Sequence, residues 1–270
     1  MTLFAAPSSR LCVQRSISVV PLFLLAISLL LAPPLLAESD SSSSISLTSL
    51  TITPASGSVV FTDPWSAEVF AQAQNSLGGF NQNFNSSIGS QVQTNAFVQF
   101  ATGQALADPV NLVLSAGSTV NIPTIPIGFV SASSQGTADL FNSSFMITGG
   151  TGQVNVTFNA MLNSLQTLFT DVHGISATSE VIFTLAINGQ VVLFRDSPLM
   201  IGSNMFAQLP FNGSVGPNSM MLDYGVPYTI FLELDSETGG QSMPEPSTIA
   251  LLIGGPALAF ARRWIMAKRA

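Results

Sequence analysis

An Asn-Gly pair between two apolar runs is the feature that most constrains the fold of this chain. Residues 181–187 form the first run, Asn188 and Gly189 the pair, and residues 190–194 the second run. A two-residue type I′ turn needs positive φ angles at both positions, which Asn and Gly adopt at low cost, and its twist matches that of paired strands. The sequence therefore predicts a β-hairpin here.

Other parts of the chain also show the two-residue period of a strand with one buried face. In residues 154–160, Val, Val, Phe and Ala alternate with Asn, Thr and Asn. Residues 228–234 are more continuously apolar and are expected at the centre of a sheet, whereas the proline-containing residues 122–128 are expected to be an extended loop or edge. Residues 65–90 fit either a long loop or a strand pair. The remaining strand candidates are residues 45–52, 91–100, 110–114, 138–147 and 154–162.

These patterns predict an all-β chain with a single β-sandwich, of the jelly-roll or immunoglobulin-like type, over residues 47–235. About 200 residues are enough to bury one good core. The Ser-rich residues 38–46 and the polar residues 236–243 are expected to be linkers, the second giving a processing enzyme access to the segment that follows. A signal peptide and a C-terminal membrane helix are expected to flank the sandwich.

The charge of the central region excludes several classes of partner. Residues 38–242 hold thirteen carboxylates and a single base, Arg195, which gives a formal charge of −12. Nucleic-acid binding needs clustered Lys and Arg, and so does attraction to an anionic membrane surface. Solubility must come from Asn, Gln, Ser and Thr, which are able to hydrogen-bond to glycans. Cys12 precedes this region, so a processed chain is expected to have no disulfide.

The first 37 residues have the composition of a secretory signal peptide. Arg10 and Arg15 precede an apolar run over residues 19–36, and Ala37 is the expected cleavage point for signal peptidase. The alternative is a permanent anchor, because the run is close to membrane-spanning length.

The C-terminal segment combines a rigid tripeptide, a short apolar run and a basic end. Its parts, in order, are Pro244, Glu245, Pro246, apolar residues 247–261, Arg262, Arg263, Lys268 and Arg269. A 15-residue helix covers roughly 22 Å, less than the roughly 30 Å of a hydrocarbon core. It is thus a marginal membrane helix. The basic residues predict a cytoplasmic C-terminus and, with Arg10 and Arg15, place the intervening chain outside the inner membrane.

On these residues, the segment from Met243 to Ala270 resembles the PEP-CTERM sorting signal. The family carries Pro-Glu-Pro, here followed by Ser247 and Thr248, then a helix and an arginine pair; Val is commoner than Met before the tripeptide. The resemblance implies that exosortase, a membrane-embedded cysteine transpeptidase, recognises Pro244–Pro246 and removes the tail. It also implies a Gram-negative host that makes exopolysaccharide.

Catalytic chemistry has little support in the sequence. His173 is the only histidine, and Asp171 and many serines would be its partners in a catalytic triad. No Gly-x-Ser-x-Gly nucleophile motif accompanies them. We therefore expect His173 to be a loop residue and the protein not to be an enzyme.

Two further groups have alternative interpretations. Asp223, Glu233, Asp235 and Glu237 fit either a structural calcium site or solvated acids, and no other cofactor or metal is expected. Arg195 is expected to pair locally with Asp196, unless it recognises an acidic sugar.

The sequence as a whole predicts a secreted, exosortase-sorted protein of the cell surface or extracellular matrix, as in a biofilm. Its expected role is structural or adhesive and linked to exopolysaccharide. One alternative is a carbohydrate-binding module that presents Trp65 or Tyr228 on a concave sheet face. The other is a membrane-anchored β-domain whose tail is never cut.

Overall fold

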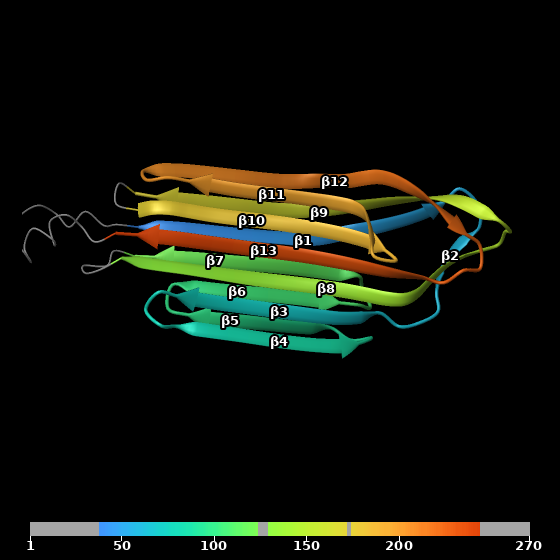
Figure 1. The fold of residues 1–270 in the computed structure, drawn as a ribbon, viewed down its shortest axis with the longest axis horizontal. Helices are drawn as coiled ribbons and strands as arrows, with labels where there is room; N and C mark the ends of the chain where they lie inside the picture. Colours follow the sequence, from blue (N-terminus) through green and yellow to red (C-terminus); the bar gives the residue numbers. More distant parts are fainter. Residues whose placement is uncertain (1–37, 124–128, 172–173, 244–270) are drawn as a thin grey trace, which may run out of the picture. The chain divides into compact units, whose positions relative to one another are not determined.

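The computed structural model describes residues 38–123, 129–171 and 174–243, which form two antiparallel β-sheets (Figure 1). Sheet A consists, in spatial order, of β12 (Met205–Asp223), β9 (Gln153–Thr170), β1 (Ser39–Pro54), β7 (Val113–Ile122), β6 (Ala101–Asp108) and β5 (Val92–Val98). Sheet B consists of β11 (Gln190–Ile201), β10 (Gly174–Ile187), β13 (Tyr228–Ser242), β8 (Val130–Thr148), β3 (Ser66–Asn75) and β4 (Phe80–Ile88), with β2 (Ser58–Phe61) paired to β8. The predicted all-β class is confirmed. Within the described ranges, no helix is long and apolar enough to cross a membrane.

The predicted hairpin is confirmed as β10 and β11. Ile187 pairs with Gln190, and the two turn residues have the positive φ angles that a type I′ turn requires, 49° at Asn188 and 76° at Gly189. The prediction that residues 228–234 occupy a sheet centre is also confirmed, because β13 lies between β10 and β8.

The two sheets pack face to face over a shared apolar core. In β9, the buried residues Val154, Val156, Phe158 and Ala160 alternate with more exposed polar residues, as their period predicts. Phe158 of sheet A meets Phe145 of sheet B edge to face, with ring centroids 6.3 Å apart, and both side chains are fully buried. Such contacts tie the sheets together through the burial of large apolar side chains.

In one part of the interior the backbones of the two sheets almost touch. A Cβ atom at Gly103 of β6 would lie 2.1 Å from the carbonyl oxygen of Gln135, and one at Gly136 of β8 would lie 2.1 Å from that of Gln104. Only glycine fits at these positions. Because the sheets are so close here, only small side chains fit between them nearby, and serines occupy these positions.

Two segments predicted to be linkers are strands instead. Residues 39–46 begin β1, and residues 236–242 complete β13 in the middle of sheet B. Ser43 and Ser236 are buried there, because the narrow interior accommodates their small side chains and gives each hydroxyl a hydrogen-bond partner. The two-sheet domain therefore extends from Ser39 to Ser242.

Two other regions also differ from, or complete, the sequence prediction. The strand predicted over residues 110–114 begins only at Val113, because Asp108 Oδ1 accepts hydrogen bonds from the amides of Val110 and Asn111 and holds a turn before it. Residues 65–90 form the β3–β4 hairpin, one of the two structures that the sequence left open.

Several predicted features lie outside the described residues. These are the signal peptide with Ala37, part of the loop over residues 122–128, His173, the tripeptide Pro244–Pro246, the helix over residues 247–261, and the basic residues Arg262, Arg263, Lys268 and Arg269.

Candidate functional site

The two ends of the described domain lie side by side. Ser39, the first residue of β1, donates a hydrogen bond of 2.9 Å from its Oγ to the carbonyl oxygen of Ser176. Ser176 pairs in register with Gln241, one residue before the end of β13 at Ser242. Figure 1 shows the start of β1 and the end of β13 at the same end of the two sheets. The first and last strands of the described domain therefore begin and end at the same end of the two sheets.

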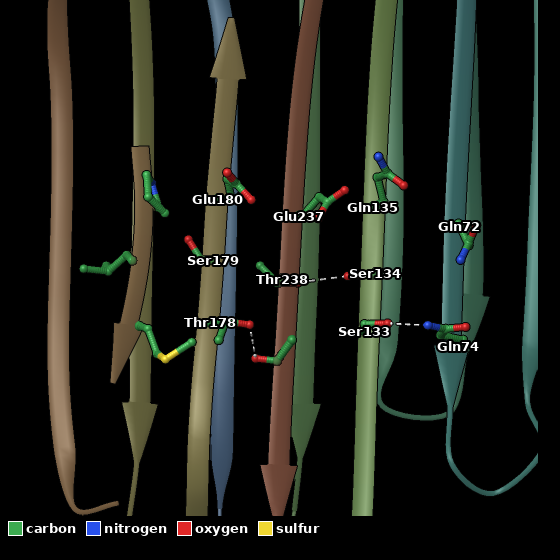
Figure 2. A pocket seen from close by; sticks show the side chains of 14 residues that line it. Gln72, Gln74, Ser133, Ser134, Gln135, Thr178, Ser179, Glu180, Glu237 and Thr238 are labelled. Atoms are coloured by element: carbon green, nitrogen blue, oxygen red, sulfur yellow. Dashed lines mark hydrogen bonds between the residues drawn. The ribbon is translucent and has the colours of Figure 1, made fainter. Parts of the chain in front are cut away.

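A shallow trough of about 480 Å³ crosses the outer face of sheet B (Figure 2). Its floor consists of the small residues Ser133, Thr178 and Gly239, on β8, β10 and β13. Gln72 and Gln74 of β3 form one wall, and Pro198, Leu199 and Met200 of β11 line the other side. The trough exists because short side chains on the central strands lie between longer ones on the flanking strands.

Amide and hydroxyl groups dominate the chemistry of the trough. Gln74 Nε2 donates to Ser133 Oγ at 2.9 Å, so part of this polar surface is already oriented (Figure 2). Ser134, which follows Ser133 in β8, and Thr238, which precedes Gly239 in β13, face the interior instead. Their hydroxyl oxygens lie 2.9 Å apart there. Polar groups presented in this way are able to hydrogen-bond to a hydroxyl-rich ligand.

The trough continues into a second hollow toward the end where β13 stops. This hollow of about 410 Å³ shares Gln74, Ser133, Thr178 and Gly239 with the first. Its other polar lining residues are Asn75, Ser76, Ser131, Ser176 and Gln241. No carboxylate lines this hollow, whereas Glu180 and Glu237 line the first.

Three carboxyl groups line up across the outer face of sheet B beyond the trough. Glu68 of β3 pairs with Asp139 of β8, and Asp139 pairs with Glu233 of β13. Burial, and then the negative charges of Glu233, Glu68 and Asp235, raise the pKa of Asp139 to about 7. These three carboxyl groups concentrate negative charge on the face, and Asp139 therefore holds its proton more strongly than an ordinary aspartate does.

The neighbouring carboxyl groups are affected in the same direction. Burial raises the pKa of Asp235, although its oxygens accept hydrogen bonds from Gln135 Nε2 at 3.0 Å and Thr137 Oγ1 at 3.2 Å. Burial, together with the charge of Asp235, also raises the pKa values of Glu233 and Glu237.

The four residues considered for calcium do not form a single group. Asp223 ends β12 in sheet A, whereas Glu233, Asp235 and Glu237 alternate along β13 in sheet B. No group of three or more His, Cys, Asp or Glu side chains in the described ranges is arranged to hold a metal ion. The calcium grouping read from sequence proximity is thus wrong for these four residues.

Neither Trp65 nor Tyr228 is available for sugar stacking. Trp65 is only 8% exposed and packs against Phe61, with ring centroids 5.2 Å apart. The ring of Tyr228 packs against that of Phe145, with centroids 6.3 Å apart, and its hydroxyl accepts a hydrogen bond from the amide of Asp223. Both side chains serve the core, so the expected concave face presenting Trp65 or Tyr228 is wrong.

Arg195 does not form the expected ion pair with Asp196. Its guanidinium carbon lies 3.6 Å from the ring centroid of Phe211, which joins β11 of sheet B to β12 of sheet A. Consecutive strand residues point to opposite faces, so Arg195 and Asp196 point away from each other. Asp196 instead shares a hydrogen bond with Glu180. Burial is the largest cause of the raised pKa of Glu180, and this hydrogen bond is the next. The single base of the domain thus holds two edge strands together through a cation–π contact.

Sequence reasoning missed an amide ladder between β4 and β5. Asn81, Asn83 and Asn85 of β4 donate from their side chains to the carbonyl oxygens of Phe97, Asn95 and Gln93, respectively. The regular spacing of these asparagines was the available signal. The amide ladder joins the two sheets along one edge.

Comparison with known proteins yields no match for this chain among family models, curated proteins or solved structures.

Proposed function

We propose that this chain is an exported protein that exosortase-type processing delivers to the cell surface, where it has a structural or adhesive role linked to exopolysaccharide. In this proposal the two sheets form a β-sandwich between a signal peptide cleaved at Ala37 and a sorting segment over residues 244–270. Signal peptidase and exosortase act on the chain in turn, and the inner membrane holds the intermediate.

One observation carries the proposal: the two processing points predicted from sequence coincide with the limits of the two-sheet domain. β1 begins at Ser39, two residues after Ala37, and β13 ends at Ser242, two residues before Pro244. Cleavage at both points would leave every described strand intact.

The position of the domain ends also supports the proposal. Two apolar segments that enter the same membrane with their basic flanks in the cytoplasm must leave it on the same side. Ser39 and Ser242 lie at the same end of the domain, next to the β10 segment that contains Ser176. The domain is therefore able to fold while both segments are in the bilayer.

The test is a Glu245→Ala substitution in the native host. We expect the variant to keep its tail and to be depleted from the cell surface, because Pro244 and Pro246 hold the tripeptide extended and present its carboxylate. Glu68→Ala, which removes an exposed carboxylate of the domain outside the trough, is the control and should be processed normally. Normal processing and display of Glu245→Ala would contradict the proposal.

A second candidate function, glycan binding, is favoured by the trough on sheet B. Its amides and hydroxyls suit a neutral, hydroxyl-rich polysaccharide, since Glu180 and Glu237 would repel an anionic one. We expect Gln74→Ala to weaken retention of the protein on such a polysaccharide in affinity electrophoresis. Gln208→Ala, at an exposed position on sheet A, should not. Equal retention of both variants would exclude the trough.

A further inference from the structure

Strand β4 is an edge strand without the usual protection. Among the described strands, it pairs only with β3, and it is the outermost strand of sheet B (Figure 1). Its sequence, Phe-Asn-Gln-Asn-Phe-Asn-Ser-Ser-Ile, contains no charge, proline or glycine. Proteins commonly protect exposed edges with charges, prolines or bulges. The edge strands on the opposite side follow this rule, with Asp196 and Pro198 in β11 and Pro210 and a register shift in β12.

The hydrogen bonds at both ends of the β3–β4 hairpin show which backbone groups of β4 are available. The amide of Asn75 donates to the carbonyl of Gly79, and the amide of Gly89 donates to the carbonyl of Trp65, each at 2.9 Å. Hydrogen-bonded residues alternate along an antiparallel pair. The odd-numbered residues of β4 therefore face β3, and the amides and carbonyls of the even-numbered ones, Phe80 to Ile88, point away from it.

The side chains of β4 divide in the same way. Asn81, Asn83 and Asn85 donate their amides to carbonyls of β5, the edge strand of sheet A on this side. The ladder thus occupies the edge of β5 and leaves that of β4 open. On the outer face, Phe80, Phe84 and Ile88 are 60%, 61% and 72% exposed. Of the outward-pointing amides, that of Ser86 donates locally to Asn85 Oδ1 at 3.0 Å. An uncharged strand with exposed apolar residues, and with an edge that no described strand pairs, is a template for another strand.

We propose that β4 pairs with β4 of a second copy of this chain, antiparallel and centred on Phe84. In this register Phe84 meets Phe84, Gln82 meets Ser86, and Phe80 meets Ile88, so apolar residues face apolar ones. It is the register that pairs all nine residues of the strand. It also makes hydrogen-bonded pairs of the residues whose backbone groups point outward.

A second copy fits this edge because the strand is complementary to itself. A two-fold interface requires each residue to meet its own counterpart or an exchanged partner, and the pattern of β4 meets this condition about Phe84. The nearest carboxylate on this face, Glu68, lies one strand further in, opposite Ser86. Sheet B would then continue from one molecule into the next. The inference stands on β4 alone and does not depend on the proposed sorting.

The register is tested with single cysteines in the full chain, purified in mild detergent, after Cys12→Ser. Facing residues of a hydrogen-bonded pair have Cα atoms about 5.5 Å apart, within disulfide range. Phe84→Cys should therefore give a disulfide-linked dimer under mild oxidation. Gln82→Cys is the control, because the two copies of residue 82 would be offset by four residues, or about 13 Å. The double variant Gln82→Cys/Ser86→Cys should form the dimer again.

Light scattering measures the same interface without crosslinking. We expect the wild-type chain to be dimeric and Phe84→Lys to be monomeric, because a buried pair of like charges would oppose association. Phe206→Lys is the control, since Phe206 is 63% exposed on sheet A and should not affect the dimer. Circular dichroism checks that Phe84→Lys remains folded. If this variant is unfolded, the cysteine variants alone test the interface. A wild-type chain that stays monomeric, or equal crosslinking of Phe84→Cys and Gln82→Cys, would overturn the inference.

Discussion

The hydroxyl oxygens of Ser43 and Ser236 lie 2.6 Å apart, and this contact joins the two sheets through their interior. Ser43 belongs to β1 of sheet A and Ser236 to β13 of sheet B. Ser118 of β7 completes a triangle, at 2.8 Å from Ser43 and 3.0 Å from Ser236. A hydroxyl donates one hydrogen bond and accepts two, so three buried serines are able to satisfy one another in a space too narrow for leucine.

Removal of one hydroxyl from this triangle should destabilise the domain. Ser236→Ala deprives both Ser43 and Ser118 of a partner, and we expect the free energy of unfolding in urea to fall by about 1–2 kcal/mol. Ser46→Ala, which removes an exposed hydrogen bond to the carbonyl of Asn163, is the control and should change stability by less than about 0.5 kcal/mol. Equal stability of Ser236→Ala and wild type would mean that the triangle contributes nothing.

Gly136 should tolerate no side chain. A Cβ atom there would lie 2.1 Å from the carbonyl oxygen of Gln104 and 2.8 Å from that of Gly117, so the sheets would have to separate. We expect Gly136→Ala to cost at least about 2 kcal/mol of unfolding free energy in urea. At Gly202 the nearest atom, the sulfur of Met205, is 4.0 Å from the Cβ position, so Gly202→Ala should be close to neutral. If both substitutions had the same small effect, the sheets would not be in backbone contact.

Stability should increase as the pH falls from about 8 to about 5. In the folded chain the pKa of Asp139 is raised from 3.8 to about 7, by burial and the neighbouring Glu233, Glu68 and Asp235. Between these pH values the folded state binds a proton that the unfolded state has released, so the free energy of unfolding falls as the pH rises. Each pKa unit is worth about 1.4 kcal/mol, and partial exposure reduces the effect, so a change on the order of 2 kcal/mol is expected.

Two variants isolate the contribution of Asp139. Asp139→Asn should reduce the pH dependence and stabilise the chain at about pH 8, as measured by urea denaturation across the pH range. Part of the dependence should remain, because burial and Glu38 also raise the pKa of Asp40 to about 7. Asp108→Asn is the control, because hydrogen bonds from Asn111 hold the pKa of Asp108 below its ordinary value and outside this pH range. An unchanged slope for Asp139→Asn would show that Asp139 is ionised in the folded chain throughout.

Truncation tests whether residues 236–242 belong to the domain. A chain that ends at Met243 keeps all of β13, so we expect it to be exported with an unchanged thermal unfolding midpoint but not retained at the surface. A chain that ends at Asp235 loses the buried Ser236, Thr238 and Ser242 between β10 and β8, and it should not fold. Export of both truncated chains with the same thermal unfolding midpoint would show that residues 236–242 are a linker and not part of the domain.

The parts of the fold that the sequence predicted are those with a local cause. Asn188 and Gly189 determine their own turn, and the alternation in residues 154–160 follows from one buried face. The serine strands were missed because burial of Ser43 depends on Ser236, which is 193 residues away in the chain.

The alternative in which Trp65 or Tyr228 is presented to a sugar was wrong for a related reason. An aromatic residue in a strand faces either the core or solvent, and composition does not distinguish the two, so the alternative with an exposed Trp65 could not be excluded from the sequence. The trough on sheet B was not predicted because it combines residues from five strands. Only the spatial order of those strands brings Gln74 next to Ser133.

The intact mass of the protein recovered from the surface of its native host tests the central claim most directly. The account predicts a chain that begins at Glu38 and ends within Pro244–Pro246, with any additional mass identifying what is attached there. A mass that extends to Ala270 would contradict it, because the C-terminal segment would then be a permanent anchor for the two-sheet domain.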